Sequence, residues 1–105
     1  MKIRLVKLGK VAFPGELLVL LDESGKTCTS QALAQKFQGW LDDPAIKTLT
    51  FVVGGPYGFP PETKQTAQQL LRLSDLTLQG DIAWLVACEQ IYRAFTILKK
   101  MPYHH

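Results

Sequence analysis

The stretch FVVGGPYGFP, residues Phe51–Pro60, joins three apolar residues to a segment rich in glycine and proline. Its glycines, Gly54, Gly55 and Gly58, permit positive φ angles and a close approach of another group to the main chain. The β-branched residues up to Val53 predict a strand. Ligands of parallel α/β sheets bind beyond the carboxyl ends of strands, so this loop is expected to border a binding site. A tight strand-to-helix turn would require similar residues, and the loop alone leaves both interpretations open.

The composition indicates one small domain. The chain has 105 residues, of which 47% are apolar and 20% charged, which suits a folded core. A net charge of +3 fits either plain solubility or a phosphate-bearing partner. Cys28 and Cys88 have no CxxC or metal-ligand spacing, and basic residues interrupt the first apolar run. We expect a reduced, cytoplasmic protein without a metal and without a membrane span.

The segments on either side of the loop predict an α/β fold with a mostly parallel sheet flanked by helices. In chain order, we expect strands over Ile3–Gly9 and Glu16–Leu21, a turn over Asp22–Lys26, a helix from Thr29 or Ser30 to about Gln38, a strand over Lys47–Val53, a helix over Glu62–Leu73, a strand over Ser74–Leu78 and a helix over Ile82–Lys100. The last helix is apolar around most of its circumference. One of its faces is therefore expected to pack on the sheet and another on a second subunit.

Five segments carry a family resemblance: LLDESGK, VVGGPYG, LSDLTL, EQIYRAF and PYH. In this order they resemble the ribosomal RNA large-subunit methyltransferase H family, which belongs to the SPOUT class of S-adenosylmethionine-dependent enzymes. The resemblance implies a single SPOUT-like domain over residues 1–105, with a trefoil knot and a homodimer. The family's cofactor contacts correspond here to Leu21, Gly54, Leu73, Ser74, Asp75, Leu76, Thr77 and Leu78. Gly55 and Gly58 are expected to expose their main chain to the same cofactor.

The resemblance also implies a reaction, the methylation of N3 of a pseudouridine in 23S rRNA within the large ribosomal subunit. His104 is the candidate to manage the proton on that nitrogen, and Tyr103 the candidate to stack on the base. Arg93, Lys99 and Lys100 are candidate phosphate contacts, although each also fits an ordinary solvated charge. The two terminal histidines are equally compatible with a disordered tail or the remnant of a tag.

Two departures from the family bear on these expectations. Only KVAFPGE joins the first two strands, so the first strand could run parallel, pair antiparallel or swap into a second subunit. The segment QGDIAW places Gly80 and Trp84 where the family usually has histidine and arginine, and it adds Asp81. Trp84 could stack on a base or adenine, or belong to the core or an interface.

These departures leave three interpretations. The first is the rRNA methyltransferase itself. The second is a SPOUT module that binds cofactor and dimerises without methylating rRNA. The third is a chain shortened artificially to study knotted folding.

Overall fold

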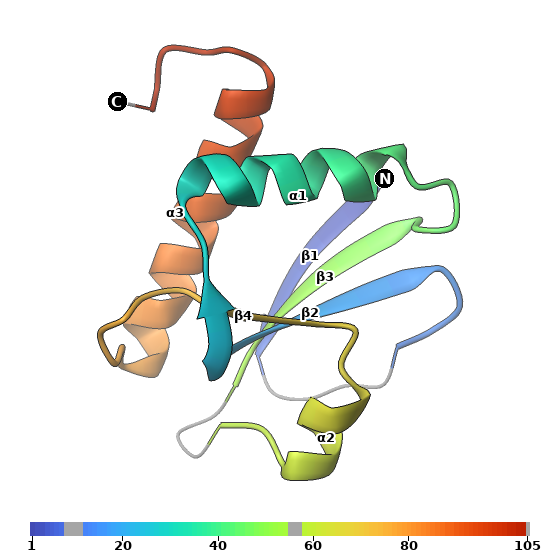
Figure 1. The fold of residues 1–105 in the computed structure, drawn as a ribbon, viewed down its shortest axis with the longest axis vertical. Coiled ribbons are helices and arrows are strands. Elements are labelled where there is room, and N and C mark those ends of the chain that lie inside the picture. The colour runs from blue at the N-terminus through green and yellow to red at the C-terminus, as the bar shows by residue number, and fades with distance from the viewer. Residues whose placement is uncertain (8–11, 55–57, 105) are drawn as a thin grey trace.

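The computed structural model describes residues 1–7, 12–54 and 58–104 (Figure 1). The elements are β1 (Lys2–Lys7), β2 (Glu16–Thr27), α1 (Ser30–Asp42), β3 (Thr48–Val53), α2 (Pro61–Thr66), β4 (Gln69–Arg72) and α3 (Gly80–Leu98). One four-stranded sheet has the order β1-β3-β2-β4, and its three strand pairs are parallel. The predicted α/β fold with a parallel sheet is thus confirmed. Of the three arrangements left open for the first strand, the parallel one is observed.

The central strand β3 is buried along its whole length, as its β-branched run predicted. Its odd-numbered residues face α1 and α3, where the Phe37 and Phe51 rings stack with centroids 5.5 Å apart. Val52 on the opposite face packs with Leu20 and Phe59, next to α2. Both faces of the sheet are therefore covered at the end where its strands lead into the glycine loop (Figure 1).

The prediction for the segment after the glycine loop was wrong in one respect. The expected helix over Glu62–Leu73 is the short α2 followed by the strand β4, and the expected strand over Ser74–Leu78 is not a strand. Leu70 and Leu71 are consecutive, and they pack against clusters on opposite sides of the sheet. Burial on both faces is available to a strand but not to one face of a helix, so tertiary packing overrides the local helical pattern.

Other element boundaries also differ from expectation. The predicted turn over Asp22–Lys26 lies within β2, which pairs with β4 on both sides of a register shift. Helix α1 continues past Gly39 to Asp42, because a Cβ at Gly39 would meet nothing within 4 Å and no φ constraint applies there. Thr29 caps α1 as predicted, accepting a hydrogen bond from the Ala32 N–H.

Candidate functional site

A cavity of about 990 Å³ lies beyond the carboxyl ends of β3 and β4 and beside residues 21–24 of β2, where the pairing of β2 with β4 changes register. Its position follows from the parallel topology, because the ends of parallel strands meet at one edge. Eight of the ten residues predicted to bind cofactor line it: Leu21, Gly54, Gly58, Leu73, Ser74, Leu76, Thr77 and Leu78. Of the other two, Asp75 is not part of this lining, and Gly55 is outside the described residues.

The glycines at the cavity have a different physical reason from the expected one. A Cβ at Gly54 would lie 3.2 Å from Phe59 Cε2, so this glycine makes room for a ring of the protein itself. Gly58 has φ +72°, where L side chains are strained, and its Cβ would lie 3.1 Å from Asp22 Oδ1. At these two described positions, the glycines make room for close packing within the chain itself.

An ion pair crosses one side of the cavity. Lys64 Nζ on α2 lies 3.1 Å from Asp22 Oδ2 on β2, and both residues line the cavity. The same carboxylate accepts hydrogen bonds from the Ser24 hydroxyl and from the Ser24 N–H, the latter at 3.0 Å. Desolvation by itself would raise the pKa of Asp22, but the Ser24 bonds and Lys64 together lower it. Asp22 is therefore an anion at neutral pH that ties α2 to the sheet.

The cavity offers walls and charges suited to an adenosyl amino acid. Four leucines line it, Leu21, Leu73, Leu76 and Leu78, and they can contact a flat heteroaromatic ring. Its charged residues carry both signs: Asp22, Glu23 and Asp81 are acidic, and Lys64 and Arg72 are basic. A ligand with an apolar ring, a carboxylate and an ammonium group would find complementary partners there. The residues present thus fit S-adenosylmethionine.

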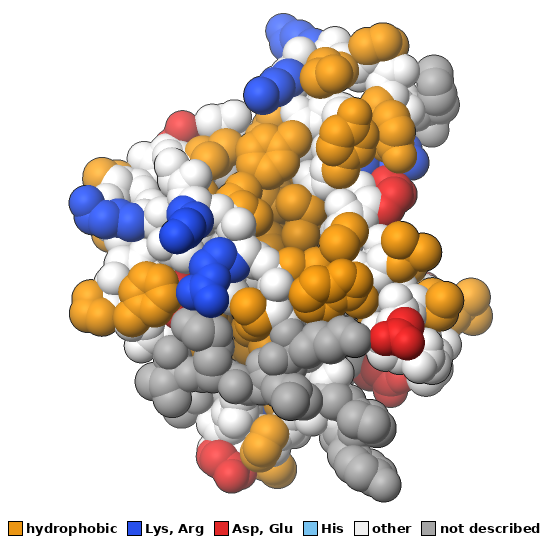
Figure 2. All heavy atoms as spheres, turned by 180° about the vertical axis from the view of Figure 1, so that it is seen from behind, with side chains coloured by type: hydrophobic (Ala, Val, Ile, Leu, Met, Phe, Trp, Pro, Cys, Tyr) orange, Lys and Arg blue, Asp and Glu red, His pale blue; other side chains and the backbone are white. Residues whose placement is uncertain are grey.

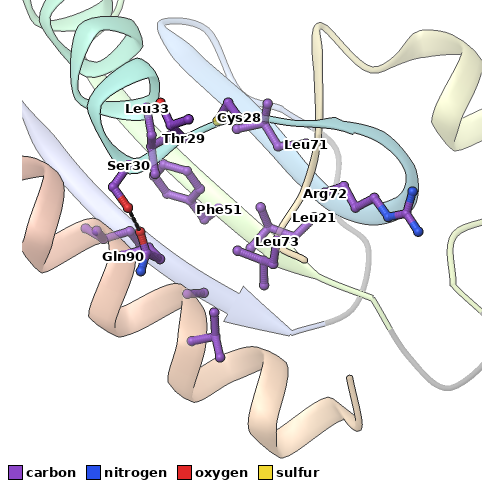
Figure 3. Close-up of a pocket in the computed structure, with 13 residues that line it drawn as sticks. Leu21, Cys28, Thr29, Ser30, Leu33, Phe51, Leu71, Arg72, Leu73 and Gln90 are labelled. Carbon is purple, nitrogen blue, oxygen red and sulfur yellow. Dashed lines mark hydrogen bonds between the residues drawn. The ribbon is translucent and has the colours of Figure 1, made fainter. Parts of the chain in front are cut away.

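A smaller cavity of about 260 Å³ adjoins the first, between β4, α1 and α3 (Figure 3). The two share Leu21, Arg72 and Leu73 in their linings. At the far side of the smaller cavity, the Ser30 hydroxyl donates to Gln90 Oε1 at 2.7 Å, which joins α1 to α3. Burial raises the pKa of the Cys28 thiol in its wall, against a smaller opposing effect of Lys36, and so keeps it protonated.

The C-terminal residues form a second cluster at the other end of α3, away from α2 (Figure 1). The Tyr92 and Tyr103 rings meet edge to face, with centroids 4.9 Å apart. The Arg93 guanidinium lies 4.8 Å from the Tyr103 ring centroid and pairs with Glu89 at 3.0 Å. His104 contacts Arg93 Nη1 through Nδ1 at 2.9 Å and the Gln31 side-chain amide through Nε2 at 2.8 Å. The structure thus brings three predicted site residues together: Arg93, Tyr103 and His104.

The contacts of His104 determine its tautomer. Arg93 can only donate, so Nδ1 of the His104 ring must accept. In a neutral ring Nε2 then carries the hydrogen, and Gln31 must turn its amide oxygen toward it. In this contact the Nδ1 lone pair of His104 is therefore taken by Arg93. None of the residues of this cluster lines the large cavity.

The remaining predicted residues lie apart from these contacts or in the core. Lys99 and Lys100 are exposed just beyond the end of α3, and Lys100 has φ 57°. Trp84 is half-buried and packs against the main apolar cluster, so its core interpretation is observed. Gly80 and Asp81, from the segment that departs from the family, line the large cavity.

Among the described residues 1–7, 12–54 and 58–104, no three His, Cys, Asp or Glu side chains gather as a metal site would require. Within the same residues, no helix has the length and apolarity needed to cross a bilayer.

The sequence comparisons identify the class. The chain matches the family described as "Predicted SPOUT methyltransferase" over residues 1–104. It belongs to the SPOUT methyltransferase family. It is 46% identical over 92 residues to the ribosomal RNA large subunit methyltransferase H of Maridesulfovibrio salexigens, covering 88% of this chain and 58% of the relative. The proteins of the same name from Phocaeicola vulgatus and Bacteroides fragilis are 41% and 39% identical, with 91% and 93% of this chain and 60% and 62% of the relatives covered.

The predicted family membership is thus confirmed. The chain spans 58% to 62% of the length of these relatives. Sequence reasoning missed Lys64 and Arg72 at the cavity. Lys64 gave no signal, because it belongs to none of the five segments that carry the family resemblance. Arg72 stands directly before LSDLTL, where its charge could have been noticed.

Proposed function

We propose that this chain binds S-adenosylmethionine in the large cavity and methylates N3 of a pseudouridine in large-subunit rRNA. The observation that carries the proposal is the gathering of eight predicted cofactor residues, from three separate segments, around one cavity. When bound, the cofactor supplies a methyl group already activated on a sulfonium. The chain itself has to hold the adenosyl group, orient the acceptor base and manage the N3 proton.

The proposed fold includes the trefoil knot of the family. Support comes from β2, which pairs with β4 twice: Leu21 lies opposite Leu71, and after the register shift Lys26 lies opposite the same residue. The intervening turn passes so close that a Cβ on Gly25 would lie 2.7 Å from the Leu71 carbonyl carbon. In Figure 3, the ribbon of β2 turns back on itself beside Arg72. A chain that passes through such a turn before forming α3 would be threaded.

The proposed assembly is a homodimer built on α3. Ile82, Leu85 and Tyr92 lie on this helix with 48%, 64% and 52% of their surface exposed. Such residues on the outside of a helix indicate an uncovered apolar face. Figure 2 shows, on the face opposite to the view of Figure 1, hydrophobic side chains gathered over a broad area with basic side chains near it. A second copy packed on this surface would cover it.

The dimer also bears on the chemistry. Asp81 lines the cavity and Arg93 holds His104, and these two positions on one helix are about 18 Å apart at 1.5 Å per residue. A single chain thus keeps its tail away from its own cavity. Two α3 helices packed antiparallel would bring the tail of one chain to the cavity of the other. We propose that His104, released from Arg93, then accepts the N3 proton, and that Tyr103 stacks on the base.

The basic residues at the tail are proposed to contact RNA. Lys99 and Lys100 are exposed next to Arg93 and the tail cluster, so a phosphate could approach all three together. In the dimer the net charge of +3 per chain would double, which favours encounter with a polyanion. A cytoplasmic location stays a prediction that accords with this substrate.

The test uses labelled S-adenosylmethionine, purified chain and large ribosomal subunits that lack the modification. We expect label in 23S rRNA, and calorimetric titration is expected to give one cofactor site per chain. Leu76→Asp should weaken cofactor binding without loss of stability, because Leu76 lines the cavity yet is 75% exposed. Leu85→Asp should instead give a monomer in sedimentation and lose methyl transfer while cofactor still binds.

A second candidate function is a module that binds cofactor without methylating rRNA. The observation that favours it is the share of the relatives' length that the chain spans, 58% to 62%. Cofactor binding without transfer, under conditions where a full-length relative is active, would support this candidate. Absence of cofactor binding would contradict both proposals.

A further inference from the structure

Arg72 makes three contacts with Ser74 and Asp75 of the predicted cofactor loop, Leu73–Leu78. Its Nε–H donates to the Ser74 carbonyl oxygen at 3.0 Å, and an Nη2 hydrogen donates to the Asp75 carbonyl oxygen at 3.3 Å. Its Nη1 lies 4.0 Å from Asp75 Oδ1. The guanidinium is planar and carries donors in a fixed fork, so two carbonyl groups held by it are fixed relative to each other.

The contacts of Arg72 shape the backbone of the loop. Two carbonyl groups of the turn point back toward β4, the strand that precedes it. In most surface loops such carbonyl groups accept hydrogen bonds from water instead. The Leu76 N–H then donates to Ser74 Oγ at 3.0 Å, which closes the turn from the other side. Leu76 is left at the tip with its side chain 75% exposed and part of it lining the large cavity.

Arg72 is also placed where the two cavities meet. It belongs to the lining of both, and its side chain extends away from the apolar residues of the smaller one (Figure 3). The Arg72 side chain remains 36% exposed, so the loop is held from the solvent side rather than from the core. The side chain therefore links the end of β4 to the wall of the cavity without filling the cavity.

We propose that Arg72 is a positioning residue that sets the conformation of Leu73–Leu78 before any cofactor is present. The consequence of this inference for cofactor affinity rests on the proposed function. A loop that is already ordered loses less conformational entropy when the cofactor binds. Lysine at this position carries the same charge, but its donors sit on one rotatable ammonium group instead of a planar fork, so it fixes the two carbonyls relative to each other less firmly. The chemistry therefore distinguishes positioning by the fork from a simple effect of charge.

The test compares Arg72→Met, Arg72→Lys and the wild-type chain, with Lys36→Met as a matched loss of one charge on the exposed face of α1. The first measurement needs no cofactor: amide hydrogen exchange at Leu76, read by NMR. We expect roughly tenfold faster exchange in Arg72→Met, partial rescue in Arg72→Lys and no change in Lys36→Met. The second is calorimetric titration with S-adenosylmethionine, where Arg72→Met should bind roughly tenfold more weakly.

Each outcome separates the inference from the proposed function. Unchanged exchange at Leu76 in Arg72→Met would overturn the inference, whether or not cofactor binds. Faster exchange with unchanged cofactor affinity would overturn its consequence for binding. A wild-type chain that binds no cofactor would contradict the proposed function, and the exchange data would still decide whether Arg72 orders the loop. Thermal unfolding of each variant shows whether the rest of the chain remains folded.

Discussion

The two ends of α3 are built by different means. At its first turn lies the large cavity, whose walls come from strand ends and from closely packed chain at Gly54 and Gly58. At its last turns lies the tail cluster, held by contacts between partly exposed side chains such as Arg93 and His104. Close packing of main chain gives a fixed shape, which suits binding. Exposed polar contacts break easily, which suits groups that must move during a reaction.

The largest expected effect is on the rate of methyl transfer, with no matching change in cofactor affinity. His104→Ala should lower the rate of rRNA methylation by roughly 10²–10⁴-fold, the usual contribution of a general base. Cofactor affinity should stay the same within about twofold, because His104 does not line the cavity. Single-turnover transfer and calorimetry on the same preparation measure the two quantities. A variant that transfers methyl at the wild-type rate would remove the tail from the proposed mechanism.

The next effect concerns the close packing of β2 at Gly25 against β4. In Gly25→Ala, the new Cβ would stand 2.7 Å from main-chain carbon of Leu71, which cannot move without shifting β4. We expect a loss of about 3 kcal/mol in the free energy of unfolding, measured in urea. Gly39→Ala is the matched control, because its Cβ would meet nothing within 4 Å. Gly39→Ala, within helix α1, should raise the free energy of unfolding by about 0.5–1 kcal/mol. If Gly25→Ala and Gly39→Ala had the same free energy of unfolding, the close approach of β2 at Gly25 to β4 would be contradicted.

Residues near the strand ends were the part of the site best predicted from sequence. The topology of parallel strands placed the glycine loop with Gly54 at a binding site, whereas Leu21 and Leu73 were expected there from the family resemblance, and all three line the cavity. The strand β4 was missed, because the residues around Leu70 and Leu71 fit a helix locally, and only pairing with β2 decides otherwise. The contacts of the tail could not be predicted. Gln31 and His104 are 73 positions apart, and no periodic pattern links them.

A smaller effect is expected from the ion pair across the cavity. Asp22→Asn removes an anion that accepts from Ser24 and faces Lys64, and it should reduce the free energy of unfolding by about 1–2 kcal/mol at pH 7. The folded-state pKa of Asp22 lies below its ordinary 3.8, so the carboxylate stabilises the fold above that pH. The contribution disappears as the pH falls through the lowered value. Urea unfolding of both proteins between pH 7 and pH 2 measures the difference.

The control for that experiment is Glu23→Gln, which removes the same charge from the neighbouring, exposed residue of the cavity lining. Its stability should follow the wild type within about 0.5 kcal/mol at every pH. A difference between Asp22→Asn and wild type that stays constant down to pH 2 would contradict the role of the ionised carboxylate. In that case the hydrogen bonds of Ser24 would be the main contribution.

The smallest effect tests the tail end of α3. Glu89 and Arg93 lie four residues apart, and their side chains are 37% and 22% exposed. Such pairs contribute about 0.3–0.5 kcal/mol, so Glu89→Gln should barely change the free energy of unfolding, and less still in 1 M salt. Arg93 also holds His104 and Tyr103, so the same substitution should broaden the NMR signals of both rings. If the rings stay fixed while stability falls by more than 1 kcal/mol, the tail is a structural element like the cavity wall, and the contrast between the two ends of α3 is wrong.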